Sequence, residues 1–147
     1  MLGHFEGGIL GNHTYHWTFT PGRKGDLAIV VPVYNDCRLV DLAAFSRHDH
    51  NIWGCVTGAG QYVGSLAAAP LRIHRTLAGW LANDCGGLLP LSKLFYPQLR
   101  NAPSIIADDD DHAWDLAFRV FIDPAAKFGC DEEEAEQQAY EQIEVAA

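Results

Sequence analysis

The 147-residue sequence has few basic residues and no long hydrophobic run. Lysine and arginine number 10 against 19 aspartates and glutamates, which gives a formal net charge of −9. This acidic excess excludes a uniformly basic nucleic-acid-binding protein and one held broadly on anionic lipid. The longest apolar stretch, Leu27 to Val33, is far shorter than the roughly 20 residues that a membrane helix needs. We therefore expect no membrane partner.

The four cysteines lack the close spacing that metal and redox motifs require. Successive cysteines stand 18, 30 and 45 residues apart, and no C-x-x-C occurs, which excludes zinc ribbons and redox pairs. The sequence also lacks the P-loop, G-x-S-x-G and H-E-x-x-H motifs of common NTPases and hydrolases. Because the N-terminal residues show no signal-peptide pattern, we expect a cytoplasmic protein with reduced, mostly buried thiols.

What is present predicts one α+β domain. Four short runs rich in β-branched and aromatic residues predict strands, which we place at residues 14–20, 27–34, 39–45 and 52–57, with a short helix as the weaker alternative for the third. Brief turns separate these runs, so an antiparallel β-meander is expected in the N-terminal half. Two or three helices and one further strand, at residues 104–107, are expected after it.

Capping residues and apolar spacing locate the helices. Thr76 and Ser92 are predicted N-caps of the first two helices. A third helix is predicted from apolar residues at positions i, i+3, i+4 and i+7, which are Trp114, Ala117, Phe118 and Phe121.

The negative charge is confined to the C-terminal end. Residues 1–107 carry eight basic and six acidic residues, whereas residues 108–147 carry two and thirteen. We predict a globular domain over residues 1–128 and an acidic C-terminal tail over residues 129–147, helical or disordered. The acids of this tail are Asp131, Glu132, Glu133, Glu134, Glu136, Glu141 and Glu144.

These features favour a small accessory or interaction protein without evident catalysis and without a cofactor. The tail acids are then the interaction residues, contacting a basic protein partner or imitating a phosphate backbone, while a solvated tail that only aids solubility is the alternative. Direct nucleic-acid binding is unlikely for so acidic a segment and is left open for the rest of the chain.

The run from Asp108 to Asp111, followed by His112, is the basis of a second hypothesis. Carboxylates at a strand-to-helix junction can hold Mg²⁺ or Mn²⁺, so Asp108, Asp110 and His112, with His48 and His50, are candidate ligands of an enzyme acting on phosphate esters. The alternative is that these acids only cap the helix and complement its dipole.

The strand leading into the aspartates, Ile105 to Asp110, is similar to the metal-binding D-x-D strand of Toprim domains. That family also has a Glu-Gly at the end of its first strand, and the Glu6-Gly7 pair of this sequence is the counterpart. Only five residues precede Glu6, and the antiparallel middle of the chain departs from the Toprim pattern.

A glycine-rich segment, Gly58 to Gly64, follows the predicted strand at residues 52–57. Its spacing is one residue too long for the dinucleotide-binding G-x-G-x-x-G motif. A hairpin or bulge is the favoured interpretation, and a phosphate-binding loop is the alternative.

Overall fold

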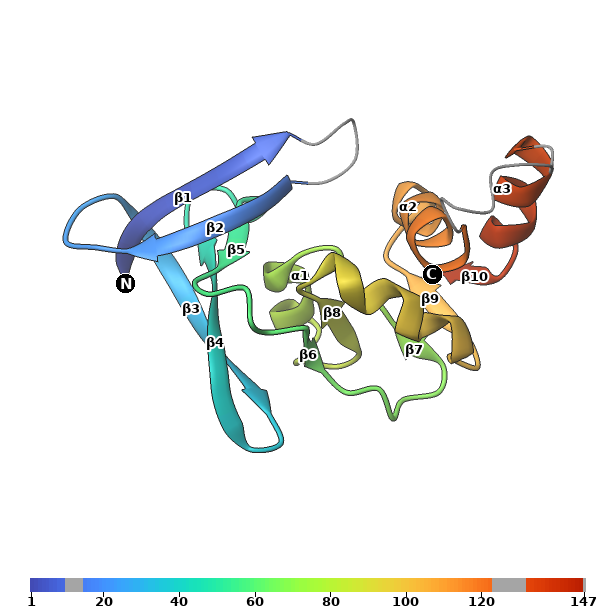
Figure 1. Cartoon of the computed structure of the whole chain (residues 1–147), viewed down its shortest axis with the longest axis horizontal. Helices are drawn as coiled ribbons and strands as arrows, with labels where there is room; N and C mark the ends of the chain where they lie inside the picture. The colour runs from blue at the N-terminus through green and yellow to red at the C-terminus, as the bar shows by residue number, and fades with distance from the viewer. Residues whose placement is uncertain (10–14, 123–131, 147) are drawn as a thin grey trace.

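The computed structural model describes residues 1–9, 15–122 and 132–146. Five N-terminal strands close into a small barrel, and the remaining strands and helices form a second, mixed α/β part (Figure 1). The barrel strands are β1 (Leu2–Ile9), β2 (Tyr15–Pro21), β3 (Asp26–Asn35), β4 (Arg38–Ser46) and β5 (Trp53–Cys55). The mixed α+β class predicted from the sequence is therefore found.

The strand order of the barrel differs from the predicted meander. The order is β1-β2-β5-β4-β3, with β3 returning to pair with β1. Consecutive strands β2 and β3 are therefore not neighbours, and the β2–β5 pairing is parallel, with Trp17 opposite Gly54. Closure of the barrel removes the exposed edges that an open meander leaves, and its interior is filled by Phe19, Ala28 and Ala44.

The β3–β4 hairpin has the turn that its sequence predicts. Asp36 and Cys37 both adopt positive φ, 47° and 64°, as a tight hairpin turn requires. The sequence also predicts an edge or a bulge around Pro32, and the β3–β4 register shifts between Val33 and Tyr34. The segment 39–45 is a strand, within β4, and not a short helix.

The second part is built from short strands and helices. Two small sheets, ordered β6-β8 and β10-β9-β7, are surrounded by the helices. The elements are β6 (Tyr62–Gly64), β7 (Leu71–Arg72), α1 (Leu77–Ala82), β8 (Leu88–Pro90), the 3₁₀ helix η1 (Lys93–Asn101), β9 (Ile105–Ala107), α2 (Asp110–Phe121), α3 (Glu132–Tyr140) and β10 (Ile143–Val145). Thr76 caps α1 and Ser92 caps η1, each by accepting a backbone N–H through its hydroxyl, as predicted.

Two of the hydrophobic cores explain how the second part is packed and how it is joined to the barrel. One core lies wholly in the second part, where Phe95, Leu99, Ile105 and Leu116 are fully buried. Another joins the two parts, because Val33 and Phe45 of the barrel pack with Leu77, Trp80 and Leu89. Burial of apolar side chains across this junction, each worth about 1.5–3 kcal/mol, fixes α1 and β8 against the barrel.

The acidic C-terminal segment is part of the folded structure over its described residues, and not a free tail. Ala139 and Ile143 are buried in the core of the second part. Strand β10 pairs in parallel with β9, placing Ile143 opposite Ile105. The predicted boundary between residues 128 and 129 lies outside the described residues.

In the described ranges, no helix combines the length and the apolar character needed to cross a membrane.

The expectation of mostly buried thiols is wrong for two of the three described cysteines. Cys37 and Cys85 are exposed, and Cys55 is half-buried. Both exposed cysteines have positive φ, which places them in turns at the surface. Cys130 lies outside the described residues.

Candidate functional site

The four aspartates are divided between structural tasks at the junction of β9 and α2. Asp109 is the N-cap of α2, where its carboxylate accepts the backbone N–H of His112 at 2.8 Å. Asp110 and Asp111 lie in the first turn, where acidic side chains complement the helix dipole. Asp109 therefore caps the helix, as the alternative to metal binding predicts.

Asp108 is held by groups from the end of β7 and from the segment that follows it. Its Oδ1 accepts from Arg72 Nε and Nη2, at 3.3 and 3.1 Å, and its Oδ2 accepts the backbone N–H of Arg75 at 3.1 Å. Partial burial by itself raises the pKa of Asp108, but the hydrogen bonds from His74, the Arg75 backbone and Arg72 hold it well below its usual range. The carboxylate is therefore ionised and internally neutralised.

Two buried histidines flank Asp108 in opposite hydrogen-bonding roles. His74 directs Nδ1 at Asp108 Oδ1, 3.4 Å away, and its Nε2 lies 2.9 Å from the Gly86 carbonyl oxygen. His112 instead accepts the backbone N–H of Asp108 at Nδ1, at 3.1 Å. Burial lowers the pKa of His112 to about 4, against the opposing attraction of Asp108, so this imidazole is neutral at pH 7.

The candidate metal ligands are not gathered at one place. His48 and His50 belong to the loop after β4 of the barrel, and the His50 ring packs edge-on against Phe45. Asp110 accepts a hydrogen bond from the Tyr140 hydroxyl, and Asp108 is occupied by Arg72. Within residues 1–9, 15–122 and 132–146, no group of three or more His, Cys, Asp or Glu side chains is arranged to hold a metal ion.

The Toprim-like residues also belong to different parts of the fold. Glu6 lies in β1 of the barrel, whereas Asp108 follows β9 in the second part. Strand β1 pairs antiparallel with both β2 and β3. The two motifs therefore do not share a sheet.

The glycine-rich segment contributes one backbone amide to the binding of an anion, and that anion is a side chain of the protein. Asp41, only 4% exposed, accepts the backbone N–H groups of Thr57 and Gly60 at 2.9 and 3.2 Å, and that of Leu42 at 2.8 Å. Burial alone raises the pKa of Asp41, but these hydrogen bonds lower it overall. Because Asp41 occupies these amides, the loop has no free nest for a phosphate at this point.

The end of α3 lies against the first turns of α2. Tyr140, at the end of α3, stacks on Trp114 of α2 with ring centroids 4.2 Å apart, and its hydroxyl donates to Asp110 at 3.1 Å. That bond raises the pKa of Tyr140. Glu144 of β10 accepts from Ser104 at 3.0 Å, and Glu136 and Glu141 are exposed.

Four of the seven C-terminal acids predicted to contact a partner have side chains that lie outside the described residues. Asp131 lies outside the described residues. The side chains of Glu132, Glu133 and Glu134 are outside them too, although the backbone of these residues begins α3.

Sequence reasoning missed the roles of Arg72, His74 and Arg75, which it would group only as a small basic patch. The structure pairs Arg72 with Asp108, and Arg75 with Asp109 at 2.9 Å, across more than thirty residues of sequence. The signal available was charge complementarity between the basic cluster at residues 72–75 and the aspartate run. Neither the parallel pairing of β7 with β9 nor its register can be derived from that signal.

Comparison with protein-family models, with curated proteins and with solved structures found no match to this chain.

Proposed function

We propose that this chain is a non-catalytic binding protein that uses an acidic face, formed by α2, α3 and β10, to contact a basic surface of a partner protein. The described acids of these elements, with the turn between α3 and β10, are Asp110, Asp111, Asp115, Glu136, Glu141 and Glu144. Arg119 is the only basic residue that α2, α3 and β10 contain, and its Nε binds Asp115 at 2.8 Å. The face is therefore strongly negative, and a cationic surface is its complement.

The docking of α3 on α2 is the observation that supports this proposal most. The Trp114–Tyr140 stack and the Tyr140–Asp110 hydrogen bond bring together two acidic clusters that are separated in the sequence. Acids on a docked helix and an adjacent helix N-terminus are held in a defined pattern, whereas those of a free tail are not. A fixed pattern of charge gives a partner orientation as well as attraction.

An exposed aromatic ring lies within this face. Trp114 is 42% exposed although one side of its ring is stacked on Tyr140. Tryptophan is among the residues that contribute most binding energy at protein interfaces, and its face attracts lysine and arginine cations. A lysine or arginine of a basic partner could therefore contact both a carboxylate and the exposed Trp114 ring on this face.

Charge neutralisation tests the proposal without removing residues from the core. A truncation after residue 129 is unsuitable because it deletes the buried Ala139 and Ile143. The variant Asp111→Asn/Glu136→Gln/Glu141→Gln removes three exposed charges from the face. The matched control, Glu6→Gln/Asp26→Asn/Asp84→Asn, removes three exposed charges elsewhere, so both variants carry the same net charge.

Binding of a fluorescent decalysine peptide, measured by anisotropy at 50 and 300 mM salt, is the readout. We expect the face variant to bind about tenfold more weakly than the wild type, at roughly 0.5 kcal/mol per charge, and the control to bind nearly as well as the wild type. Equal losses in both variants would mean that only the net charge matters, and the proposed face would be wrong.

A further inference from the structure

The outer face of the barrel carries an uncovered apolar row at the start of β3. Leu27 and Ile29, two positions apart on β3, are 39% and 45% exposed, and Leu2, which pairs with Leu27 from β1, is 40% exposed. Ala28, between the first two, points the other way and is buried in the interior of the barrel. Since residues directly opposite each other on paired strands lie on the same face, Leu2, Leu27 and Ile29 form one surface, which we call the apolar row.

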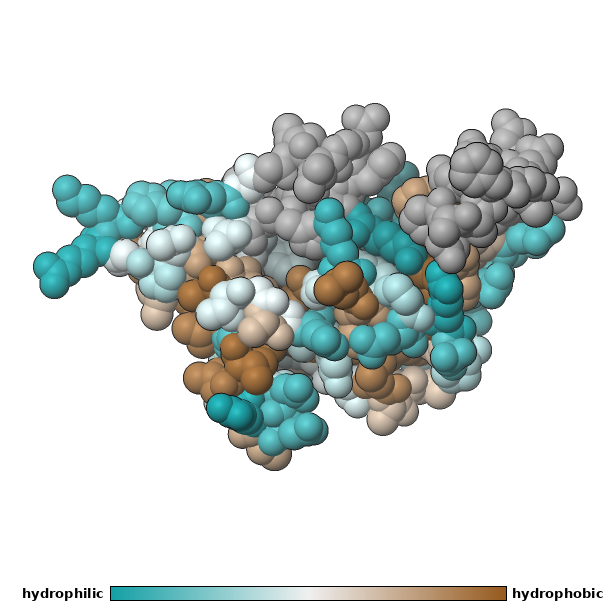
Figure 2. Space-filling view, in the orientation of Figure 1, coloured by the Kyte–Doolittle hydropathy of each residue, from teal (hydrophilic) through white to brown (hydrophobic). Residues whose placement is uncertain are grey.

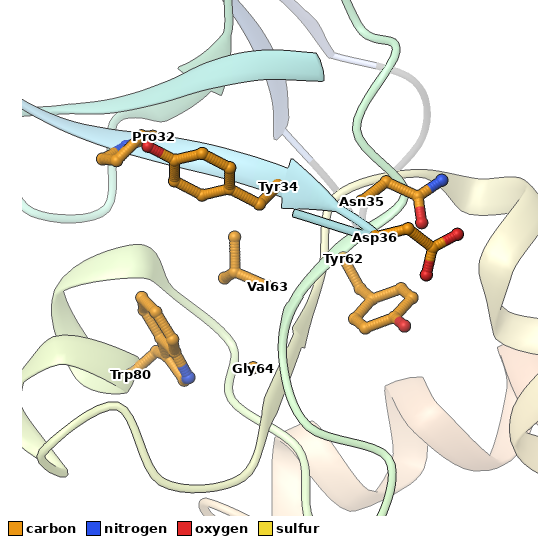
Figure 3. A pocket seen from close by; sticks show the side chains of 8 residues that line it. All are labelled: Pro32, Tyr34, Asn35, Asp36, Tyr62, Val63, Gly64 and Trp80. Carbon is orange, nitrogen blue, oxygen red and sulfur yellow. The ribbon is translucent and has the colours of Figure 1, made fainter. Parts of the chain in front are cut away.

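Nearer the hairpin tip, the same face of β3 is covered by the second part. Val33 is buried in one core with Val63 of β6 and Trp80 of α1, and Figure 3 shows the side chains of Val63 and Trp80 beside this end of β3. Val31 is half-buried at the margin of that core, and Ile29 lies two residues beyond it. The cover therefore ends before the apolar row, and hydrophobic side chains reach the surface over the β3–β4 hairpin (Figure 2).

Three basic residues border the apolar row. Arg47 follows β4 directly, and its backbone N–H donates to the carbonyl oxygen of Leu27 at 2.9 Å. Arg23 and Lys24 lie in the turn between β2 and β3, which is hydrogen-bonded back to the carbonyl oxygen of Leu2. All three basic side chains are exposed, and none forms an ion pair with a carboxylate of the described residues. We call them the basic border.

Two acids lie at the same end of the barrel. Asp26 precedes Leu27 on β3, so its side chain points to the opposite face from the apolar row. Asp49, in the loop after β4, accepts the backbone N–H of Asn51 at 2.9 Å. This end of the barrel keeps a small positive excess, whereas α2, α3 and β10 are strongly negative.

The acidic face has the complementary composition. It combines exposed carboxylates such as Asp111 with the Trp114 ring, which is 42% exposed. An apolar centre with a charged rim is typical of protein interfaces, and opposite rim charges favour association. The β2–β3 turn and α3 lie at opposite ends of the long axis of the molecule (Figure 1), so the two surfaces of one chain cannot meet.

We propose that the apolar row and its basic border receive the acidic face of a second copy of this chain. This inference rests on the proposed function and names the partner of the acidic face. Because the two surfaces are different, the contact is heterologous, and a pair of chains keeps one unused surface of each kind. Such contacts extend head to tail into open chains or close into rings.

Sedimentation velocity of the full-length chain tests the proposal. Samples between about 5 and about 500 µM cover the range of weak self-association. We expect the mean mass to rise with concentration at 50 mM salt and to fall toward that of one chain at 300 mM, because salt screens exposed charges. A chain that stays monomeric over the whole range at 50 mM salt would overturn the proposal.

A double substitution in the apolar row locates the contact. Leu27→Thr/Ile29→Thr keeps residues that suit a strand and should weaken self-association about tenfold. The matched control is Tyr34→Thr/Leu39→Thr, which changes two residues that are 59% and 54% exposed at the other end of the same hairpin. The control should associate as the wild type does, and equal losses in both variants would contradict the assigned surface.

Mixing two variants shows whether the contact is heterologous. Lys24→Gln/Arg47→Gln weakens the basic border and keeps the acidic face, whereas Asp111→Asn/Glu136→Gln/Glu141→Gln does the reverse. Each variant alone should associate weakly. An equal mixture should form complexes of two chains and stop there, because only one pair of intact surfaces remains. A mixture that associates no better than its components would overturn the proposal.

The decalysine measurement separates this proposal from the proposed function. If decalysine binds the acidic face while the chain stays monomeric, the acidic face stands and the second copy is the wrong partner. If decalysine binding is unchanged in the face variant, the proposed function fails, and this inference fails with it.

Discussion

The ring of Tyr140 lies almost flat on the ring of Trp114, with centroids 4.2 Å apart and planes inclined by 17°. This contact joins the end of α3 to the exposed side of α2. The same tyrosine donates its hydroxyl to Asp110. Tyr140 therefore holds α3 on α2 by packing and hydrogen bonding at once, in addition to the burial of Ala139 and the pairing of β10 with β9.

Replacing Tyr140 with alanine should release α3 from α2. Both the stack and the hydrogen bond are lost, while the pairing of β10 with β9 remains. Hydrogen exchange should become faster for the amides of residues 136–141 and change little in the barrel. Tyr140→Phe keeps the stack and should show a smaller increase. Unchanged exchange in Tyr140→Ala would contradict the assigned role of this contact.

Asp108→Asn should destabilise the fold by about 2 kcal/mol at pH 7, because Arg72 and the Arg75 amide lose an ionised acceptor. The lowered pKa of Asp108 means that this carboxylate contributes stability above its unfolded value of about 3.9 and loses it as the pH falls toward the folded value. The difference between wild type and variant in urea unfolding should therefore shrink below about pH 4. The exposed Asp111→Asn serves as control, and a difference that stays constant down to pH 2 would argue against the ion pair.

His112 should make stability depend on pH in a higher window. Its pKa is lowered to about 4 in the fold, against about 6.5 when unfolded, so the neutral form is favoured and stability falls as the pH drops from 6.5 toward 4. The expected loss is about 2–3 kcal/mol across this window. In urea unfolding, the free energy of unfolding of His112→Gln should change less between pH 7 and 4.5 than that of the wild type. An equal slope in both proteins would mean that another group titrates there.

Asp41→Asn should cost about 1–3 kcal/mol, because a neutral amide oxygen replaces a carboxylate that accepts three backbone N–H groups. Thermal or urea unfolding measures this directly. In the wild type, phosphate should leave the amide signals of Thr57 and Gly60 unmoved, since Asp41 occupies both. Phosphate-induced shifts at these two amides would restore the phosphate-loop interpretation.

Local signals predicted local structure well. Thr76 and Ser92 cap helices as expected, and the Asn35 to Arg38 turn is found, because each depends on residues within a few positions. Strand β1 was not anticipated, since its glycines have low strand propensity. Gly3 is required there, because a Cβ at this position would lie 2.5 Å from carbon atoms of the Phe19 ring.

Long-range relationships could not be predicted from the sequence. Residues Ile143 to Val145 form too short a run to be distinguished from the acidic segment around them, and their partner β9 lies almost forty residues earlier. The same holds for Asp108, whose neighbours Arg72 and Arg75 reach it only because β7 and β9 pair. The aspartate run was recognisable from its charge, but the role of each aspartate depends on the residues that the fold places next to it, such as Arg72 next to Asp108.

The measurement that tests the central claim most directly is a map of amide shifts when decalysine is titrated into the ¹⁵N-labelled chain. We expect the largest shifts in residues 110–114 and 136–146, with the Trp114 indole signal among them, and their loss at 300 mM salt. Shifts confined to the barrel, or spread evenly over the whole surface, would contradict the proposal that α2, α3 and β10 form the binding face.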